Sequence, residues 1–526
     1  MSSENVEIMR LLMANRNERK LHKRKCDATG KNIISAYHAD APFKVYKNDF
    51  WWSDQWNALD YGRDFDFSRP FFEQYAELQK VVPREGTSVF NSENCEYNGH
   101  IRESRNCYLN ALVYRCEDID YCYWMVNVKN AIDCYLLIDS EICYWCIDTI
   151  KAYDCIGLQE GFNCSECYFS FQLVGCHNCL FCTNLKNKSF HIMNEPCSKE
   201  EFEAAKKEIF DGTHASFWNA MEKFNQLKKN TVHRYAHNIN CENVTGDHMA
   251  GCRNCADCFE GFDSENCSNC VSLDHSHDVH NCYSAGWPGC DKIYNSVVTR
   301  GSTDIAFCIY TFFSSSLRYC DSSHRADNCF GCIGMQHKQY CILNKQYSKD
   351  EYLKLLPRIN KHMKQTNEFG NFFPPSLSFF TYNETAAQDY FPLDEKHALA
   401  LGFKWRKDEK KDYQPPTVSV MPENSSDADF NFTKEILACE DCRKNYRIIE
   451  RELSFYHKHG LPIPRKCHDC RHKIRSNMRN ALKLFSDKCD NCGVDIKTTY
   501  GKRRVEKLLV SLATVYCEKC YLSSIE

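Results

Sequence analysis

The stretch that decides the fold is residues 122–146, which read CYWMVNVKNAIDCYLLIDSEICYWC. Short runs of aromatic and branched apolar residues follow two of its cysteines, Cys122-Tyr-Trp-Met-Val and Cys134-Tyr-Leu-Leu-Ile. No apolar period of 3.6 residues is sustained here, so the runs predict strands and not helices. Reduced cysteines are small and apolar enough to stack inside such a sheet.

The same pattern extends outward over residues 95–341. Two blocks, residues 95–182 and 241–341, hold thirteen cysteines each, and asparagine directly precedes cysteine ten times. Every cysteine spacing in the first block is a multiple of three, and the recurrent long spacing is 21 residues, as from Cys122 to Cys143. A fixed period near 20 residues is typical of solenoids. The sequence therefore predicts a mainly β protein, a parallel β-helix with coils of about 21 residues and with Asn or Asp at the corners.

A second repeat indicates that this unit is duplicated. A pattern of five residues recurs at an offset of 150: Asn194, Ser198-Lys199 and Glu201-Phe202 correspond to Asn344, Ser348-Lys349 and Glu351-Tyr352. In both copies Ser-Lys-x-Glu forms a capping box that begins a helix. We therefore expect two solenoid arms, each ended by a helix that caps the open edge of the sheet.

Eight cysteines near the C-terminus have the spacing of zinc ligands. In each of two modules a C-x2-C motif is followed by a second one, and the separation between the two motifs is the same in both modules. The predicted ligands are Cys439, Cys442, Cys467 and Cys470 in the first module, and Cys489, Cys492, Cys517 and Cys520 in the second. Two C-x2-C turns close a tetrahedral shell and leave no position for water. The sequence therefore predicts two structural zinc-ribbon sites.

The N-terminal segment aligns with the second zinc module but lacks most of its ligands. Lys25-Cys26-Asp27 matches Lys488-Cys489-Asp490, whereas Thr29, Lys47 and Phe50 occupy the positions of Cys492, Cys517 and Cys520. We expect a ribbon-like fold that holds no metal. The aromatic run that follows, residues 51–75, is expected to be a core or interface plug, with base stacking as the alternative.

Basic residues cluster around the zinc modules. Arg471, Arg475 and Arg479 repeat every four residues, which places them on one helix face. The candidate nucleic-acid-binding residues are Arg465, Lys466, Arg471, Lys473, Arg475, Arg479, Lys483, Lys502, Arg503 and Arg504. A basic helix next to a zinc knuckle suits phosphate contacts, while the alternative is a solvated face that has no partner.

The length of 526 residues implies several domains. We expect a degenerate ribbon and aromatic plug at 1–80, solenoid arm 1 at 90–197, a helical insert at 198–232, solenoid arm 2 at 238–347, a helix and aromatic docking segment at 348–407, a linker at 408–433, zinc ribbon 1 at 434–485 and zinc ribbon 2 at 486–526.

Composition and charge indicate in which cellular compartment the protein is expected and which partners are excluded. The net charge of −4 excludes a wholly basic nucleic-acid coat. Residues 1–25 lack the apolar core of a secretory signal, and no stretch reaches the ~20 apolar residues that span a bilayer. We therefore expect a cytoplasmic protein with no membrane partner, in which the 36 cysteines stay reduced.

Two family resemblances add to this interpretation. Phe455-Tyr456-x3-Gly460-Leu461-Pro462 and Pro464-Arg465-x-Cys467-x2-Cys470-Arg471 resemble the small probable zinc-ribbon family, which implies zinc binding. Trp51-Trp52-Ser53-Asp54, Asp60-Tyr61-Gly62-Arg63-Asp64 and Ser376-Leu377-Ser378 resemble an uncharacterised cysteine-rich zinc-ribbon family of small-genome bacteria, often labelled CaiB/BaiF. That label would imply a CoA-transferase, but the chain offers no assignable nucleophilic Asp and no CoA-binding signature.

We consider three hypotheses about the function of this protein. The leading hypothesis is a non-enzymatic zinc-binding scaffold or adaptor that docks on nucleic acid or a ribonucleoprotein through its basic zinc modules, or on a protein. The alternative is a protein that handles metal or iron–sulfur clusters with its solenoid cysteines, for example Cys176-x2-Cys179-x2-Cys182. A weaker alternative is an enzyme with a site between the arms, although no set of catalytic residues with convincing spacing stands out.

Overall fold

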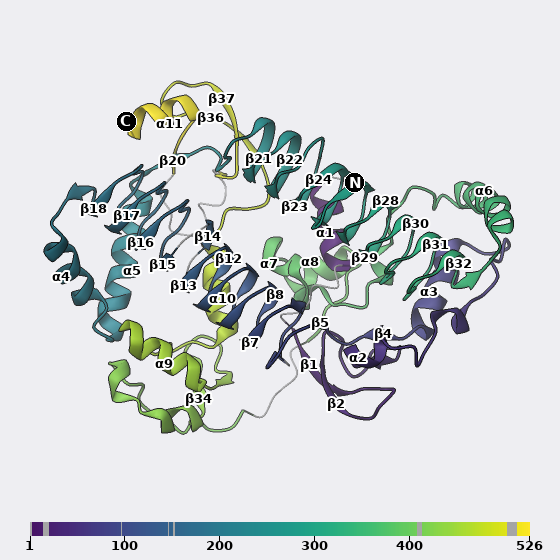
Figure 1. Ribbon diagram of the computed structural model, residues 1–526, viewed down its shortest axis with the longest axis horizontal. Coiled ribbons are helices and arrows are strands. Elements are labelled where there is room, and N and C mark those ends of the chain that lie inside the picture. Colours follow the sequence, from purple (N-terminus) through teal and green to yellow (C-terminus); the bar gives the residue numbers. More distant parts are fainter. Residues whose placement is uncertain are drawn as a thin grey trace.

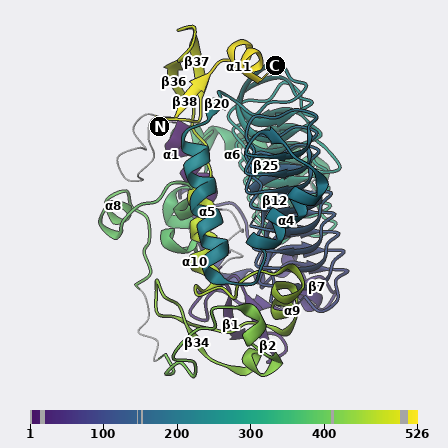
Figure 2. The same ribbon diagram turned by 90° about the vertical axis from the view of Figure 1, so that its left-hand side faces the viewer.

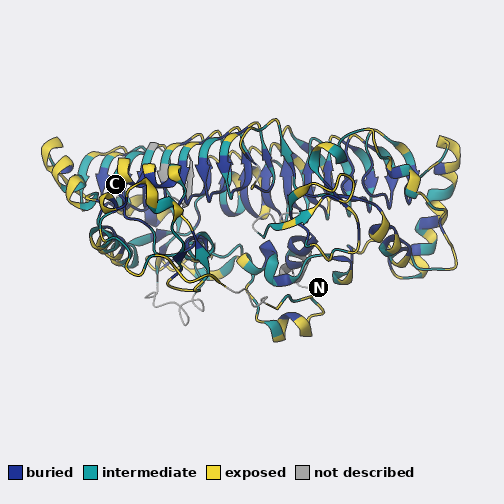
Figure 3. Ribbon diagram, turned by 90° about the horizontal axis from the view of Figure 1, so that it is seen from below, coloured by how far each residue is buried: buried dark blue, intermediate teal, exposed yellow. Residues whose placement is uncertain are grey.

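The computed structural model describes residues 3–13, 20–95, 97–145, 147–150, 153–407, 413–501 and 513–525. Strands dominate the described chain, and nearly all of their long-range pairings are parallel. Figure 1 shows two stacks of short strands, arm 1 (residues 89–196) and arm 2 (residues 242–346), whose strands succeed one another in opposite directions, and Tyr310 of arm 2 donates to Ser88 just before the first strand of arm 1. Most helices and the small modules lie on one side of the two stacks (Figure 3).

Arm 1 consists of two sheets to which successive strands contribute alternately for most of its length. One sheet contains β5 (Val89–Phe90), β6 (Ile101–Arg102), β8 (Ala111–Tyr114), β10 (Tyr123–Val126), β12 (Tyr135–Ile138) and β14 (Ile147–Ile150). The other contains β7 (Arg105–Tyr108), β9 (Glu117–Asp120), β11 (Lys129–Ile132), β13 (Glu141–Tyr144), β15 (Tyr153–Ile156), β16 (Ser165–Tyr168), β17 (His177–Leu180), β18 (Ser189–Ile192) and β19 (Glu195–Pro196).

Arm 2 repeats this arrangement. Its first sheet contains β21 (Glu242–Ala250), β22 (Arg253–Phe262), β23 (Val271–Asp274), β25 (Tyr283–Gly286), β27 (Val297–Arg300) and β29 (Ile309–Phe312). Its second contains β24 (Ser276–His280), β26 (Cys290–Tyr294), β28 (Thr303–Ala306), β30 (Ser315–Arg318), β31 (Asp327–Phe330), β32 (Gln339–Ile342) and β33 (Lys345–Gln346).

The offset between neighbouring strands corrects the predicted coil length. Tyr123 pairs with Tyr135, and Cys143 pairs with Cys155, so the chain returns to the same place at an offset of 12 (135 minus 123) and not of 21. One local exception is an offset of 14, between Ser276 and Cys290, where the chain carries extra residues around Trp287-Pro288. Residues at the longer spacing of 21 are therefore not paired with each other in neighbouring strands.

The underlying period is three residues. From Glu103 to Asp139 in arm 1 a positive φ recurs at every third residue, for example at Asn106 and Leu109, and the residue after each of them, such as Cys107 or Asn110, is buried. Each 12-residue repeat of this stretch thus supplies four buried positions. Cysteine occupies only some of these positions, so the distance between two cysteines of arm 1 is always a multiple of three residues. The spacing of 21 residues is one such multiple and not the length of the structural repeat.

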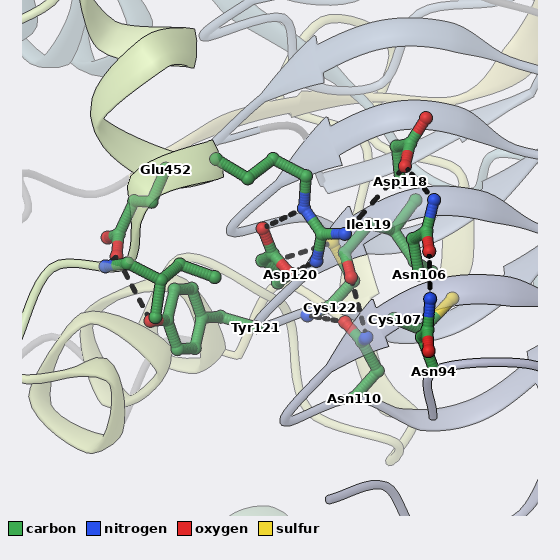
Figure 4. Close-up of polar contacts among 12 residues, drawn as sticks. Asn94, Asn106, Cys107, Asn110, Asp118, Ile119, Asp120, Tyr121, Cys122 and Glu452 are labelled. Atoms are coloured by element: carbon green, nitrogen blue, oxygen red, sulfur yellow. Dashed lines mark hydrogen bonds and ion pairs between the residues drawn. The ribbon is translucent and has the colours of Figure 1, made fainter. Parts of the chain in front are cut away.

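The backbone conformation also explains the Asn-Cys dipeptides. All ten asparagines that precede a cysteine in the two arms have a positive φ, as at Asn163 (51°) and Asn328 (49°). The left-handed conformation costs most L-residues roughly 1–2 kcal/mol, and asparagine reaches it more readily than other residues that carry a Cβ. Their side chains also stack: Asn94 donates to Asn106 (2.9 Å), and Asn106 donates to Asp118 (2.9 Å) (Figure 4).

The ends of the two arms match as the 150-residue repeat predicts. Ile192 pairs with Glu195 at the end of arm 1, and Ile342 pairs with Lys345 at the end of arm 2, in both cases as an antiparallel return. Both capping boxes are formed, and they begin α4 (Lys199–Ile209) and α6 (Lys349–Gln365). Helix α4 is followed by α5 (His214–Lys229), which lies beside the strands of arm 1 (Figure 2).

Other short elements cover the arms. They are α1 (Ser3–Met13), β1 (His22–Lys25), β2 (Asn32–Ser35), β3 (Val45–Tyr46), α2 (Asn48–Trp51), η1 (Ala58–Tyr61), α3 (Phe71–Val81), β4 (Arg84–Glu85), β20 (Val232–Arg234), η2 (Pro375–Leu377), η3 (Tyr382–Glu384), α7 (Ala386–Tyr390) and α8 (Glu395–Ala400). Within the aromatic run, Phe71 and Tyr75 are buried and belong to one cluster with Phe330 of arm 2. Helix α1, which was not predicted from the sequence, packs on the same cluster.

Part of the predicted linker is in contact with the rest of the molecule. Residues 408–412 lie outside the described residues, whereas η4 (Ser425–Asp427) and η5 (Phe430–Lys434) follow directly on a segment that pairs with the helical insert. The backbone N–H of His214 donates to the Glu423 carbonyl (2.8 Å), and Gly212 and Ser425 are also hydrogen bonded through their backbones.

One histidine at the contact between the plug and arm 2 gives a prediction about acid stability. His324 is 3% exposed, lies 4.9 Å from the Trp52 ring and 4.8 Å from the Phe312 ring, and neither of its ring nitrogens has a hydrogen-bond partner among the described residues. Burial lowers its pKa from 6.5 to about 3. Below pH 6.5 the unfolded chain therefore takes up a proton that the folded chain does not, and stability is lost as the pH falls from 6.5 to 3.

At pH 5 this effect amounts to about 2 kcal/mol. We expect His324→Phe to remain folded and to lose less stability than the parent protein between pH 7 and pH 5, as measured by urea denaturation at each pH. The comparison isolates His324 because other groups titrate equally in both proteins. An identical loss in the variant would show that His324 is not held neutral.

Candidate metal centres

The four cysteines of the first C-terminal module converge. Cys439 and Cys442 lie in the turn between β34 (Leu437–Ala438) and β35 (Asn445–Tyr446), and Cys467 and Cys470 lie at the start of α10 (His468–Asn477). The four sulfur atoms all lie within 4.8 Å of one another, and Sγ of Cys442 is 3.6 Å from Sγ of Cys467. Helix α9 (Glu450–His459) connects the two halves. We call residues 434–485 module 1.

The second module repeats this construction. Cys489 and Cys492 lie in the turn between β36 (Phe485–Lys488) and β37 (Asp495–Thr498), and Cys517 and Cys520 lie between β38 (Thr514–Tyr516) and the first turn of α11 (Glu518–Ile525). These sulfur atoms also all lie within 4.8 Å of one another, with 3.7 Å between Cys492 and Cys517. We call residues 486–526 module 2.

The sulfur distances fit a tetrahedral metal ion. A zinc–sulfur bond of about 2.3 Å places neighbouring sulfurs of a tetrahedral shell roughly 3.8 Å apart, whereas a disulfide requires about 2.05 Å. The observed 3.6 and 3.7 Å agree with the first value and exclude the second. Both groups can therefore hold a metal ion in a closed shell that has no open position for catalysis.

Backbone N–H groups favour the thiolate form that a metal requires. Burial by itself raises the pKa of Cys439, but hydrogen bonds from the backbones of Cys442 and Cys467 outweigh it and lower the pKa to about 7. In module 2, the backbones of Cys492 and Cys517 likewise lower the pKa of Cys489 to about 6 against the effect of burial. Thiolates, and not thiols, are the metal ligands.

The N-terminal segment forms the same turn although it lacks three of the ligands. The N–H of Gly30 donates to the Cys26 carbonyl (2.8 Å), as Gly493 does to Cys489 (2.9 Å). The N–H of Lys47 donates to Sγ of Cys26 at 3.2 Å, which is also the distance from Cys517 N to Sγ of Cys489. The turn therefore forms without a metal shell, and Trp51 and Tyr46 pack on Cys26 instead. Arg16 and Asn17 lie outside the described residues.

The structure corrects the prediction for the three arginines of the helix face. Arg471 (2% exposed) and Arg475 (0%) are buried against arm 1, and the Arg479 side chain is only 7% exposed. Nε of Arg471 lies 2.7 Å from one oxygen of Asp133, and Nη1 of Arg475 lies 2.7 Å from the other. Arg479 pairs with Glu260. Contacts within the protein therefore occupy the groups that the sequence assigned to phosphate.

The remaining basic candidates are divided. Arg465 pairs with Glu423 at 2.6 Å, and Lys466 pairs with Asp441 at 2.7 Å. Lys473 and Lys483 are exposed. Lys502, Arg503 and Arg504 lie outside the described residues. The described residues thus do not bring the predicted set together as one basic surface.

The cysteines inside the arms behave as buried thiols. The Cys164 thiol donates to the Phe162 and Leu173 carbonyls, both at 3.4 Å, and the same pattern recurs at Cys176 with Val174 and Leu185. Among the described residues, the groups of three or more ligand atoms that lie within 4.8 Å of one another include no arm cysteine. The geometry therefore favours packing and weak hydrogen bonding over cluster binding.

Two further groups of ligand atoms were not found from the sequence. Glu160, His237 and His248 bring their ligand atoms within 4.8 Å of one another, and so do His277, Asp278 and Asp291 on an exposed surface. Glu160 belongs to one arm and His248 to the other, so no sequence spacing could have indicated the first group. His277 and Asp278 are adjacent, but exposed groups of this kind are common without metal.

Cavities of different sizes lie between module 1 and arm 1, and one of about 270 Å³ is lined by Trp145, Trp218 and Arg465. A cavity of about 30 Å³ lies among Tyr123, Tyr135, Tyr390 and Arg479, and a second of the same volume lies among Tyr121, Tyr123 and His468. Each has room for about one water molecule.

Within the described chain, no helix has both the length and the apolar character that crossing a bilayer requires. No known family model matches this chain, and no curated protein matches it.

Proposed function

We propose that this protein is a non-enzymatic scaffold in which two zinc-stabilised modules hold two β-solenoid arms, each with 12-residue coils, in a fixed arrangement. The proposal rests on one observation: polar side chains of both modules, among them Arg471, Arg475 and Thr499, make buried contacts with the arms. Zinc is proposed because four thiolates in a closed tetrahedral shell suit that ion.

Module 1 docks on arm 1 through buried charges. Asp133 of arm 1 pairs with Arg471, which directly follows Cys470, and with Arg475, which lies about one helical turn further on. Glu452 of α9 is fully buried and accepts a hydrogen bond from Tyr121 of arm 1 at 3.0 Å (Figure 4). Glu452 also pairs with Arg471 at 3.1 Å. Buried ion pairs of this kind depend on geometry, because a displaced partner leaves an uncompensated charge. The metal that fixes α10 therefore also supports this interface.

Both modules contact both arms. Arg479 at the end of module 1 donates to the Tyr135 hydroxyl of arm 1 (2.8 Å) and pairs with Glu260 of arm 2. In module 2, Tyr521 donates to Asn184 of arm 1 (3.0 Å), and Thr499 donates to Asp247 of arm 2 (2.6 Å). Strand β38 also pairs in parallel with β20, the strand that connects the arms.

This arrangement favours a structural role for the modules over nucleic-acid docking through the same arginines. A phosphate ligand requires exposed cations, and Arg471, Arg475 and Arg479 are buried or nearly so. The scaffold proposal needs no catalytic group and no metal inside the arms. In this proposal the C-x2-C pairs bind metal in order to hold the parts of the chain together.

The test is metal removal from the full-length protein under reducing conditions without oxygen. We expect two thiolate-bound zinc ions per chain, and we expect that a chelator accelerates amide exchange in β38 and α10 and also in β20, which contains no ligand. The central strands of arm 1, such as β10, serve as the internal control and should keep their protection. If chelation changed exchange only at the cysteine turns, the modules would not hold the arms.

A further inference from the structure

The junction between the arms contains a third group of metal-ligand atoms, which has no cysteine. Glu160 comes from arm 1, His237 from the segment between β20 and β21, and His248 from β21 of arm 2. Module 2 covers the same place, since Thr499 donates to Asp247 and the Tyr500 ring lies 6.2 Å from the His237 ring. Three parts of the chain that are distant in sequence, at residues 160, 237–248 and 499–500, therefore meet here.

The distances suit one ion between these side chains. Nδ1 of His237 lies 3.9 Å from Oε2 of Glu160, and Nε2 of His248 lies 3.6 Å from Oε1 of Glu160. Metal–nitrogen and metal–oxygen bonds of about 2.0–2.2 Å place tetrahedral ligands roughly 3.3–3.5 Å apart, so shifts of a few tenths of an ångström would complete the shell. The imidazole centroids are 5.1 Å apart.

The distance between the two imidazole centroids can be compared with the distance expected when both rings bind the same ion. An imidazole centroid lies about 3.2 Å from a bound zinc ion, so two centroids at this separation would subtend roughly 105° at the ion. The two ring planes are 19° apart, and the rings would turn so that each plane contains the ion. The side chains of Glu160 (7% exposed) and His237 (10%) are nearly removed from solvent, and His248 is 20% exposed. The fourth position would remain for water or an added ligand.

Asp247 holds the two histidines in place. One of its carboxylate oxygens accepts the backbone N–H of His237 (2.6 Å) and of His248 (3.0 Å) and also lies 3.1 Å from Nδ1 of His237. Its other oxygen accepts the Thr499 hydroxyl (2.6 Å). With these contacts made, Asp247 is a positioning residue and Glu160 is the carboxylate ligand.

Gln172 can set the tautomer of His237. Its amide nitrogen lies 3.0 Å from Nε2 of His237, while its amide oxygen is buried and has no hydrogen-bond partner among the described residues. Flipping the amide exchanges its oxygen and nitrogen, and the oxygen then accepts a hydrogen bond from the Nε2–H group. Nδ1, which lies 3.1 Å from Asp247 and 3.9 Å from Glu160, then carries the lone pair that a metal ion requires. A hydrogen bond to the second ring nitrogen is the usual support of a metal-binding histidine.

The balance of charge at this junction also favours a bound divalent cation. Two carboxylates, Glu160 and Asp247, share this nearly dry junction with two imidazoles. Buried charges require compensation, and a divalent cation supplies it with both imidazoles uncharged.

We propose that His237, His248 and Glu160 bind a third divalent transition-metal ion, which links the two arms beneath module 2. Imidazole and carboxylate ligands suit zinc or iron(II), in contrast to the four-thiolate sites. The site does not depend on the scaffold proposal, because its ligands lie outside both cysteine groups. It couples the position of arm 1 to that of arm 2 through ligand bonds.

The test counts metal ions on the full-length protein by native mass spectrometry, after equilibration with zinc and removal of excess. We expect three ions in the parent protein and two in His248→Ala and in the near-isosteric Glu160→Gln. His275→Ala is the matched control, because His275 also lies beside two aspartates of arm 2 but is 57% exposed, and it should keep three. Gln172→Leu should weaken binding of the third ion about 10- to 100-fold and leave the other two in place.

Cobalt(II) separates this site from the cysteine sites without any substitution. The two thiolate shells give sulfur-to-cobalt charge-transfer absorption, whereas a third equivalent bound by nitrogen and oxygen should add only weak ligand-field bands. A parent protein that saturates at two equivalents, or variants of both His248 and Glu160 that retain three ions, would overturn the proposal. If the cobalt protein showed no charge-transfer bands, zinc binding by the two modules would be refuted instead. The experiment therefore distinguishes failure of the third site from failure of the scaffold proposal.

Discussion

Replacing Cys467 by serine is expected to remove one metal ion and to detach α10 from arm 1. Structural zinc sites contribute roughly 10–16 kcal/mol to the folding of small modules, so three remaining thiolates should not hold module 1 together. Cys467 directly precedes α10, which carries Arg471 and Arg475 into the arm. We expect one ion fewer per chain and faster amide exchange throughout α9 and α10.

Cys26 offers a matched control within the same chain. It occupies the equivalent turn, with the same hydrogen bonds as Cys489, but Thr29, Lys47 and Phe50 replace the other ligands. Cys26→Ser keeps an acceptor for the Lys47 N–H and should leave the metal content unchanged. Equal metal loss in Cys26→Ser and Cys467→Ser would mean that the N-terminal turn also takes part in metal binding.

Replacing Asp133 by alanine is expected to weaken the docking of module 1 by about 3–5 kcal/mol. Asp133 is 0% exposed and pairs with two arginines, of which Arg475 is also fully buried. Removing this one carboxylate leaves Arg475 as a buried cation that keeps contacts with the Tyr121 carbonyl (3.3 Å) and the Trp145 ring. Amide exchange in α10 should then become about 10²- to 10⁴-fold faster, provided that it occurs by opening of this interface.

Arg465→Ala provides the comparison for a surface ion pair. Its partner Glu423 is 57% exposed, so the change should cost about 0–1 kcal/mol. The metal content should stay the same in both variants, because neither residue is a ligand. If Asp133→Ala and Arg465→Ala had equally small effects, the buried pairs would not be what holds module 1 on the arm.

Local chemistry made several features predictable. The C-x2-C spacing identified all eight cysteines that converge, because a zinc knuckle is a turn whose geometry is encoded within a few residues. The capping boxes at Ser198 and Ser348 were predictable for the same reason. The short apolar runs indicated strands, and the 150-residue repeat located the matching ends of the arms.

Other features depended on contacts between distant residues. The 12-residue offset was obscured, because cysteine fills only some of the buried positions that recur every three residues. The spacing of Arg471, Arg475 and Arg479 placed them on one helix face, but only the docked structure shows that this face meets Asp133 and Glu260. A basic stripe has the same sequence pattern whether it faces phosphate or buried carboxylates.

The strands, the starts of the two capped helices and the two four-cysteine groups could be predicted from the sequence, because each is specified by residues close together in the chain. The contacts of the cysteine modules with the arms and the position of the third ligand group could be seen only in the tertiary structure. Glu160 and His248 are brought together by the packing of one arm against the other, and Thr499 of module 2 covers them through Asp247. Such a site has no spacing in the sequence, since its geometry exists only after the arms and modules have assembled.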